Sequence, residues 1–456
     1  MNIEYTHVKD LLPYAANART HSRKQVRQIA KSIERFGFNN PVLIDDKMQI
    51  IAGHGRVQAA KLLGMTAVPT VRLSHLSETD KRAYILADNK LAEKAGWDRE
   101  ILAIELQALI ELDVIDVELT GFETAEIDII LDDAREAAGA PAGPEDDAPE
   151  YASGPAITRL GDLWVMGSHR LLCADCRDQE AYASLLEGAK AEFVFTDPPY
   201  NVQIDGHVSG LGRIRHGNFA MGCGEMSETE FAAFLEEVFR LQAANTVDGS
   251  IHQICMDWRH MGEMLAAGHK VYSELKNLCI WNKSNGGMGS FYRSKHELVF
   301  VWKSGSAPHI NTFELGQHGR SRSNVWDYAG ANVPKSNRLE ELAMHPTVKP
   351  VALVADAIKD CSRRNGLVLD PFAGSGTVLI AAERTGRKAR ALEIDPHYVD
   401  VAVRRWQTYT GKAAVLAATG ATFEEVGESR QHLSLLPDSE QQPPMMNCPI
   451  ETECSP

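Results

Sequence analysis

The stretch FVFTDPPYN, residues 193 to 201, organises the second half of this 456-residue chain. Its apolar start, Phe193 to Thr196, predicts a buried parallel strand, and two prolines stop both a strand ladder and a helix directly after it. Asp197 and Tyr200 therefore fall in a stiff loop at the carboxyl end of a strand, where open α/β sheets hold their ligands. A carboxylate, proline-fixed carbonyls and a flat phenol ring suit the exocyclic amine of a planar base. A rigid turn capped by Asp explains the four residues equally well, so a partner motif must decide.

That partner lies downstream, where a second apolar strand, GLVLD at residues 366 to 370, leads into PFAGSGT and the helical run VLIAAERTG. Strand, glycine-rich turn and helix start form a cofactor cradle, because glycines let backbone N–H groups approach a ligand and the first turn of a helix has unpaired donors. Glu393 follows nineteen residues after Gly374, at the end of the next apolar strand. A carboxylate at this spacing suits the two hydroxyls of a ribose.

DPPYN, HPTVKP at residues 345 to 350, DPFAGSGT and EIDP together resemble the motifs of S-adenosylmethionine-dependent amino-methyltransferases of DNA. The base motif precedes the cofactor loop, as in the permuted β group of that family, and the resemblance covers about residues 157 to 410. It implies a Rossmann-like α/β methyltransferase domain, S-adenosyl-L-methionine as the cofactor and double-stranded DNA with a flipped target base as the substrate. The enzyme would be a site-specific DNA methyltransferase, either solitary or part of a restriction-modification pair.

The resemblance assigns roles residue by residue. Asp197, Pro198, Pro199 and Tyr200 form the catalytic loop, in which Asp197 and the Pro198 carbonyl accept hydrogen bonds from the amine and Tyr200 stacks on the base. The implied cofactor-binding residues are Asp175, Lys349, Asp370, Pro371, Phe372, Gly374, Ser375, Gly376, Thr377 and Glu393. Lys349 and Pro350 would line the methionine end, and Glu393 would hold the ribose. Asp175 stands where the family has Gly-Asp, although Ala174 replaces that glycine here.

Two acceptors that grip an aromatic amine favour the tetrahedral nitrogen that attacks a sulfonium methyl, so we expect no metal site. A single CxxC, Cys173 and Cys176, is in any case a poor zinc site. Asp at the first position of DPPY, where cytosine-modifying relatives often carry Ser, favours the N6 amine of adenine over the N4 amine of cytosine. Methylation of RNA or protein uses similar loops and stays open.

Residues outside these motifs indicate how DNA is recognised. Residues 305 to 344 interleave basic and aromatic side chains between two motif blocks, which is typical of target recognition, although a solvated loop stays an alternative. Trp281, Lys283, His296 and Glu297 match a family region that frames the base pocket, with His296 expected to be structural. The basic residues that we expect to contact DNA are Arg293, Arg320, Arg322, Lys335 and Arg338.

Residues 1–75 predict a separate small α+β module, with a helix in residues 21 to 38 that Gly37 ends. GHGRVQAAKLLG, residues 53 to 64, resembles the ParB and sulfiredoxin-like fold. His54 stands where a sulfiredoxin has Cys, so peroxidase repair is not expected. Arg56 at a helix start can meet a phosphate, but a docking module without catalysis is favoured. A nucleotide or protein partner for this module, and a homodimer, stay open.

The remaining boundaries follow from composition. We expect a helical extension in residues 76–135, which opens with a capping box of Ser77 and Asp80. It is followed by an acidic flexible linker in residues 136–156, the catalytic domain in residues 157–415 and a disordered tail in residues 416–456. The net charge of −15 is concentrated in residues 118 to 150, with −10, and residues 421 to 456, with −6, so it does not exclude nucleic acid. No apolar run reaches about 18 residues, which predicts a cytoplasmic protein without a membrane partner. A DNA-binding partition regulator with a silent methyltransferase domain is the alternative from another functional class.

Overall fold

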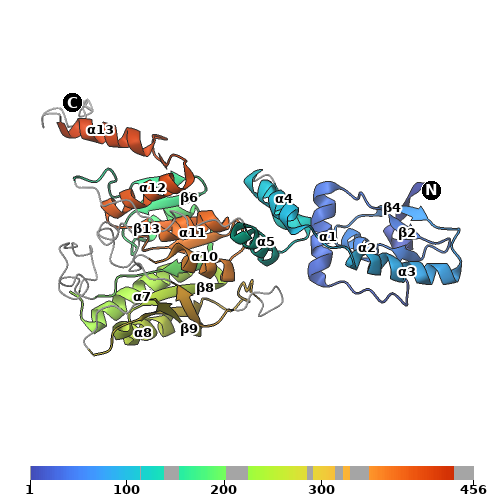
Figure 1. The fold of residues 1–456 in the computed structure, drawn as a ribbon, viewed down its shortest axis with the longest axis horizontal. Coiled ribbons are helices and arrows are strands. Elements are labelled where there is room, and N and C mark those ends of the chain that lie inside the picture. The colour runs from blue at the N-terminus through green and yellow to red at the C-terminus, as the bar shows by residue number, and fades with distance from the viewer. Residues whose placement is uncertain are drawn as a thin grey trace, which may run out of the picture. The chain divides into compact units, whose positions relative to one another are not determined.

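The chain divides into two compact units, Met1–Ala140 and Pro141–Pro456 (Figure 1). The computed structural model describes residues 2–112, 115–137, 154–201, 224–284, 291–313, 322–328 and 349–435. Most of the predicted linker, residues 138–153, lies outside the described residues. Among the described residues, no helix has both the length and the apolar character that a membrane crossing requires.

The first unit is the small α+β fold that the sequence predicts. Its strands β1 (Ile3–His7), β2 (Val42–Ile44), β3 (Ile50–Ala52) and β4 (Ala67–Arg72) form one sheet in the order β1-β4-β2-β3. Its helices are α1 (Arg23–Phe36), α2 (His54–Leu62), α3 (Glu78–Glu93), α4 (Arg99–Leu112) and α5 (Thr124–Ala137).

Local signals fix the ends of these helices. Ser22 caps α1 by accepting a hydrogen bond from the Gln25 N–H, and Gly37, at φ 86°, ends it. The predicted capping box of Ser77 and Asp80 is confirmed at the start of α3. Both features depend only on neighbours within four residues, which is why the sequence predicts them.

The second unit is built on a ten-stranded sheet in the order β11-β9-β10-β8-β7-β12-β13-β6-β5-β14. Its strands are β5 (Leu163–Met166), β6 (His169–Cys173), β7 (Ala191–Thr196), β8 (Thr246–Met256), β9 (Glu274–Lys283), β10 (His296–Lys303), β11 (Val325–Tyr328), β12 (Leu367–Asp370), β13 (Lys388–Glu393) and β14 (Val415–Leu416). Its helices are α6 (Gln179–Leu186), α7 (Glu228–Ala244), α8 (Met261–Val271), α10 (Val351–Cys361), α11 (Thr377–Thr385), α12 (Pro396–Thr410) and α13 (Phe423–Leu435).

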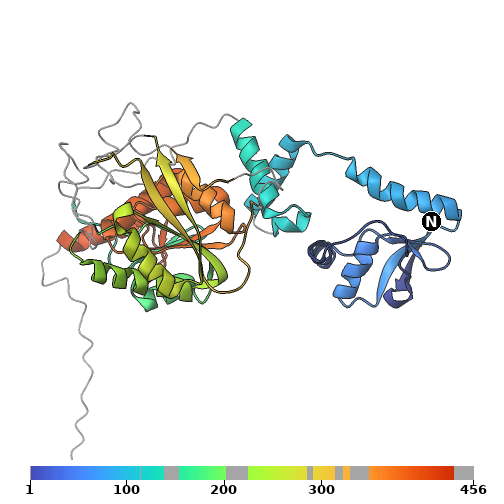
Figure 2. The ribbon, with the colours of Figure 1, turned by 90° about the horizontal axis from the view of Figure 1, so that it is seen from below.

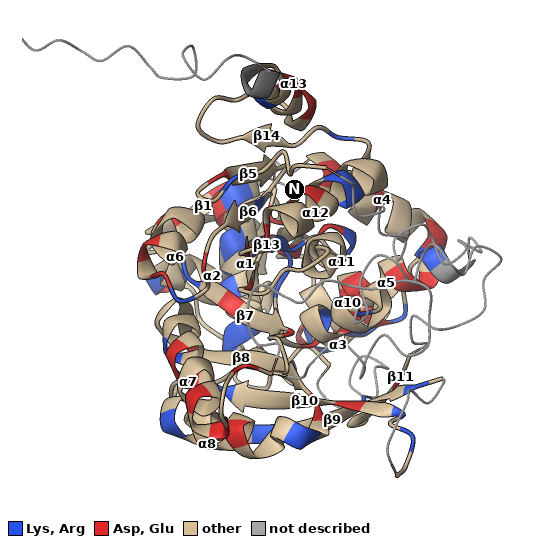
Figure 3. Cartoon of the chain, turned by 90° about the vertical axis from the view of Figure 1, so that its left-hand side faces the viewer, with Lys and Arg blue, Asp and Glu red and all other residues tan. Residues whose placement is uncertain are grey.

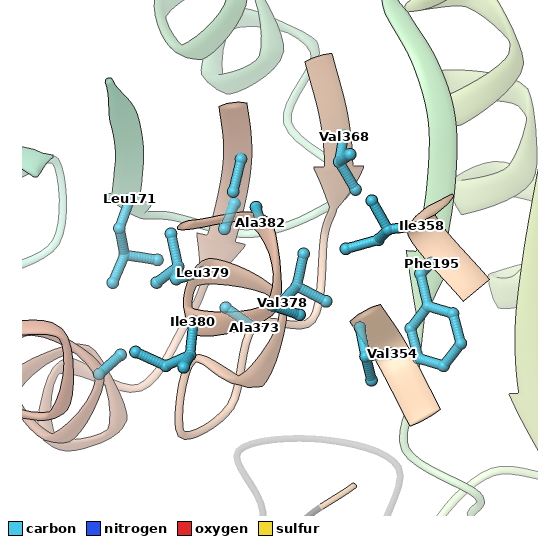
Figure 4. Packing of buried hydrophobic residues seen from close by; sticks show 14 of the residues in the cluster. Leu171, Phe195, Val354, Ile358, Val368, Ala373, Val378, Leu379, Ile380 and Ala382 are labelled. Carbon is cyan, nitrogen blue, oxygen red and sulfur yellow. The ribbon is translucent and has the colours of Figure 1, made fainter. Parts of the chain in front are cut away.

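Helices cover both faces of this sheet, which gives three layers and confirms the predicted α/β class (Figure 2). Side chains of β7 alternate between the two cores: Phe193 and Phe195 pack in the core that includes α10, α11 and α12, whereas Val194 packs in the core that includes α6, α7 and α8. In Figure 4, Phe195 lies beside Val354 and Ile358 of α10. Figure 3 shows acidic and basic residues along α7 and α8, whereas β7 and β8 are mostly uncharged.

The fold places the two predicted motif strands side by side. β7 and β12 are parallel neighbours, with Val368 opposite Phe193 and Leu369 opposite Val194. The helix after β7, α7, packs on one face of the sheet, and the helix after β12, α11, packs on the other. The chain therefore leaves the sheet in opposite directions at this pair, which is the topological switch point where such sheets bind ligands.

The sequence prediction starts the disordered tail at residue 416, but residues 416 to 435 include a helix and the end of a strand. In place of disorder, β14 pairs with β5, and α13 packs Phe423 and Val426 into the core, with the Phe423 ring 5.1 Å from that of Trp164. Arg430 of α13 also forms an ion pair with Asp162. Two apolar residues three apart were enough to bury one side of a helix in an otherwise polar segment. Residues 436–456 lie outside the described residues.

Candidate active site

Asp370, at the end of β12, joins the two motif strands. Its Oδ1 accepts hydrogen bonds from the Thr196 hydroxyl of β7, at 2.7 Å, and from the Phe372 N–H, at 3.0 Å. Burial raises the pKa of Asp370 to about 7, although these hydrogen bonds oppose that rise. Asp370 therefore anchors the start of the glycine loop to the strand that carries Asp197.

Glu393, at the end of β13, holds the middle of the same loop. Its Oε2 accepts from the Gly374 N–H at 2.8 Å and its Oε1 from the Asp395 N–H at 2.9 Å. Burial raises the pKa of Glu393 to about 7 against these hydrogen bonds. The carboxylate thus stands directly at the glycine loop, as the sequence spacing predicted.

The glycine loop needs its glycines for two separate reasons. Gly374 and Gly376 have φ of 51° and 82°, a region that disfavours any residue with a Cβ. A Cβ on Gly376 would also lie 2.8 Å from the Cβ of Ala402 in α12. The loop is thereby pressed against α12 and presents its backbone at the start of α11, next to Glu393. A backbone cradle with an adjacent carboxylate fits the ribose and amino-acid parts of S-adenosylmethionine.

Arg405 of α12 supports this cradle from behind, and sequence reasoning missed it. Its Nη1 donates to the Ser375 carbonyl at 3.2 Å, the Ser375 hydroxyl at 3.3 Å and the Thr377 hydroxyl at 3.1 Å. Ser375 and Thr377 are therefore tied to the protein interior by their side chains. Arg405 is only 2% exposed, and a charged residue on the buried face of an expected helix was the available signal.

Asp175 follows β6, whose last residue, Cys173, pairs with Glu393 in the sheet. The Ala174 N–H donates to the Glu393 carbonyl at 3.0 Å, so Asp175 lies at the same edge as the glycine loop. Its carboxylate accepts two hydrogen bonds from the Arg177 guanidinium, at 2.7 and 3.1 Å. Burial alone would raise the pKa of Asp175, but Arg177 outweighs it and holds that pKa below its usual value.

Asp197 lies in a partly buried cluster of two carboxylates and two lysines. The Tyr200 hydroxyl donates to Asp197 Oδ1, and Lys349 Nζ pairs with Asp197 Oδ2. Lys349 Nζ also lies 3.2 Å from Glu297 Oε2, and Lys283 Nζ lies 3.0 Å from Glu297 Oε1. If all four are ionised, the cluster is neutral, which is how buried charges are tolerated.

Burial and pairing shift the pKa values in this cluster in opposite directions. Burial raises the pKa of Asp197, and Lys349 opposes the rise. Burial would also raise the pKa of Glu297, but Lys349 and Lys283 outweigh it and hold that pKa below its usual value. Burial would lower the pKa of Lys349, whereas Asp197 and Glu297 more than compensate and raise it. Lys349 therefore opposes the rise in the pKa of Asp197 and favours the ionised form of that carboxyl.

The sequence resemblance places Lys349 at the methionine end of the cofactor, which stays a prediction. Its ammonium contacts the Asp197 carboxylate and lies 5.6 Å from the centroid of the Tyr200 ring. Trp281 completes the surroundings, with its ring centroid 5.8 Å from Lys349 Nζ and 4.6 Å from Lys283 Nζ. Glu297 and Lys283, expected only to frame the base pocket, are ion-pair partners in this cluster.

Asn201 fixes the segment that follows Tyr200. It has φ 52°, and its Oδ1 accepts from the Gly224 and Met226 N–H groups, at 3.1 and 3.2 Å, while its Nδ2 donates to the Met226 carbonyl at 2.7 Å. The two ends of the intervening segment are thereby held together. Residues 202 to 223 lie outside the described residues.

The residues expected to contact DNA have different outcomes. Arg293 is described and exposed, whereas Arg320, Lys335 and Arg338 lie outside the described residues. Arg322 does not point to solvent: its Nε lies 3.0 Å from Asp360 Oδ2, and its Nη1 donates to the Tyr328 hydroxyl at 3.0 Å. Arg322 is therefore half-buried and paired with carboxylates of α10, and its contact with DNA stays a prediction.

The second unit is thus a doubly wound α/β domain in which a glycine-rich loop and an acidic loop follow two adjacent strands, and a separate α+β unit precedes it in the chain. A DNA methylase model (N6_N4_Mtase) matches residues 191–404, a ParB N-terminal domain model matches residues 2–90 and a ParB-methyltransferase HTH domain model matches residues 100–160. The second unit therefore carries a domain of the N6/N4 family of DNA methylases, and the first unit carries a ParB-like N-terminal domain.

Individual relatives match different parts of the chain. The ParB-like nuclease domain-containing protein YnaK of Escherichia coli K12 is 54% identical over 82 residues, which is 18% of this chain and 94% of that protein. The type II methyltransferase M2.MboI of Moraxella bovis is 22% identical over 244 residues, 50% of this chain and 85% of its own. The crystal structure of the M1.HpyAVI–SAM complex, 18% identical, aligns with a TM-score of 0.38 over 52% of this chain and 97% of that one.

Proposed function

We propose that the protein transfers a methyl group from S-adenosylmethionine to the N6 amine of adenine in double-stranded DNA. The observation that carries the proposal is the half-buried carboxylate of Asp197, paired with Lys349 at the end of β7, beside the glycine loop after β12. In this proposal, Pro198 and Pro199 stiffen the loop, and Asp370, Glu393 and the glycine loop hold the cofactor.

Asp197 and the Pro198 carbonyl accept hydrogen bonds from the two N–H groups of the amine. The amine lone pair is then less available to the aromatic ring and more available at nitrogen. When bound, the cofactor would supply the methyl group of its sulfonium, whose S–CH3 bond would break as the N–C bond forms and leave a neutral thioether. The nitrogen becomes positively charged as the new N–C bond forms, and the carboxylate of Asp197 stabilises that charge and then accepts the proton.

Amine entry requires a rearrangement within the cluster. Both oxygens of Asp197 are engaged, one by Tyr200 and one by Lys349. Glu297 Oε2 already lies 3.2 Å from Lys349 Nζ and has no other hydrogen-bond partner among the described residues, so it is a ready acceptor for the ammonium. Lys349 therefore turns toward Glu297 when the base arrives, which frees one oxygen of Asp197 without leaving a buried charge unpaired.

Cytosine N4 is the second candidate, because two acceptors grip any exocyclic amine. The Asp at position 197 favours adenine, since cytosine-modifying relatives often carry Ser there. Mass spectrometry of nucleosides from unmethylated plasmid DNA, incubated with the purified protein and S-adenosylmethionine, decides between them. N6-methyladenine is the expected product; N4-methylcytosine would refute the base assignment, and no methylated base would refute DNA methylation under these conditions.

A further inference from the structure

Two adjacent aromatic residues, Phe291 and Tyr292, are the most exposed large hydrophobic side chains among the described residues, at 86% and 81%. Their ring centroids lie 4.5 Å apart in an edge-to-face arrangement. The rings thus contact each other, but the protein leaves most of their surface in water. An exposed apolar pair of this size is typical of a binding surface.

Their place in the sheet ties this pair to the active site. β9 and β10 are antiparallel, with His296 opposite Asn282, and the Lys283 N–H donates to the Lys295 carbonyl at 2.9 Å. Glu297, the second residue of β10, belongs to the ion-pair cluster of Asp197. Tyr292 is five residues before Glu297, so the aromatic pair lies no more than about 18 Å along the chain from that cluster.

The charge around the pair identifies the partner. Arg293 and Lys295 follow it directly, and both are exposed. Aromatic rings flanked by cations suit a nucleic acid, in which bases offer flat faces and phosphates offer negative charge. A purely apolar protein partner would not require the cations.

We propose that Phe291 and Tyr292 insert into the DNA base stack next to the target and occupy the space that the flipped base leaves, while Arg293 and Lys295 contact the adjacent phosphates. The proposal rests on the proposed function, since it concerns the same bound DNA. Flipping a base costs stacking energy, and an inserted aromatic side chain recovers part of it. The aromatic pair therefore lowers the cost of flipping and has no direct contact with the reacting atoms.

The test compares the full-length wild type with the double variant Phe291→Ala/Tyr292→Ala on two duplex oligonucleotides. Both carry the site at which the wild type methylates plasmid DNA, and one has an abasic nucleotide opposite the target. On the intact duplex we expect kcat/KM of the variant to fall by about 10- to 100-fold. On the abasic duplex, where the target is already poorly stacked, the variant should match the wild type within a few-fold.

Two control variants accompany the test. Phe291→Tyr/Tyr292→Phe keeps both rings and should retain wild-type rates, and Tyr5→Ala removes an aromatic residue of similar exposure, 78%, from the first unit and should have no effect. An equal defect of the double alanine variant on both duplexes would show that the pair only maintains the loop, and full activity on the intact duplex would show that it does not assist flipping. Either result overturns the proposal. Failure of the wild type to methylate plasmid DNA would instead refute the proposed function.

Discussion

Replacing Lys349 by Met tests the electrostatics of the site. The substitution keeps a long, unbranched side chain of similar volume and removes the charge that contacts Asp197. Asp197 and Glu297 are then left with Lys283 as the remaining cation of the cluster. Because burial already raises the pKa of Asp197 and Lys349 is the main group that opposes the rise, the variant should raise that pKa further.

Coulomb's law gives the size of the effect. Two unit charges about 4 Å apart in an effective dielectric of about 20 interact by ~4 kcal/mol. Rearrangement of Glu297 and Lys283 and the partial exposure of Asp197 reduce this interaction, so the pKa of Asp197 should rise by less than the full interaction would give. Asp197 must be ionised to accept from the amine. The acidic limb of the profile of kcat/KM against pH therefore moves to higher pH, and activity returns as the pH is raised.

The assay measures kcat/KM for unmethylated plasmid DNA across the pH range, together with the Kd for S-adenosylmethionine. Lys349→Arg retains the charge and serves as the matched control, with an acidic limb close to that of the wild type. An acidic limb of Lys349→Met that coincides with the wild type would refute the electrostatic role. Weaker cofactor binding with an unchanged profile would instead support the methionine-end position that the sequence predicted.

Gly376→Ala should lower the free energy of unfolding by about 2–4 kcal/mol and weaken cofactor binding, because the new Cβ meets Ala402 at a backbone φ of 82°. Gly411→Ala, at φ 70° with open space around it, is the control and should lower the free energy of unfolding by about 1 kcal/mol. Urea unfolding and cofactor titration measure both variants, and equal losses of stability would contradict the packing argument. Arg322→Met should lower the free energy of unfolding by about 3 kcal/mol, because it removes the cation that pairs with the buried Asp360 carboxylate. The affinity for plasmid DNA should stay unchanged. Weaker DNA binding without loss of stability would instead support the predicted contact of Arg322 with DNA. The hydrogen bond from His169 lowers the pKa of Glu383 to about 2, so this pair stabilises the fold above the ordinary pKa of 4.5, and its contribution disappears as the pH falls toward 2. In Glu383→Gln the free energy of unfolding should therefore depend less on pH between these two values. An unchanged pH dependence would count against the pair.

Features that depend on neighbouring residues were predictable from the sequence. The strand before DPPY, the strand before the glycine loop and the spacing of Glu393 gave the adjacent ends of β7, β12 and β13, because parallel strands of a doubly wound sheet share one functional edge. The capping box of α3 depends on residues three apart. Short-range patterns of this kind are strong because few conformations satisfy them.

Contacts between distant segments were not predictable. Lys349 is 152 residues from Asp197, and nothing in HPTVKP indicates that its ammonium meets the catalytic carboxylate. Arg322 lies in a basic, aromatic stretch that resembles a DNA-binding surface. Its guanidinium nevertheless pairs with Asp360 of α10, which is 38 residues away in the sequence. Which charge pairs form is decided by how β11 and α10 pack, and composition does not contain that information.

The central claim is that Asp197 is the acceptor that activates the target amine. The most direct measurement incubates wild type and Asp197→Ala with unmethylated plasmid DNA and S-adenosylmethionine, quantifies methylated nucleosides by mass spectrometry, and titrates the cofactor against both proteins. We predict N6-methyladenine from the wild type, none from Asp197→Ala and equal cofactor affinity, since the glycine loop and Glu393 are untouched. Near-normal turnover by Asp197→Ala would contradict the assignment of Asp197.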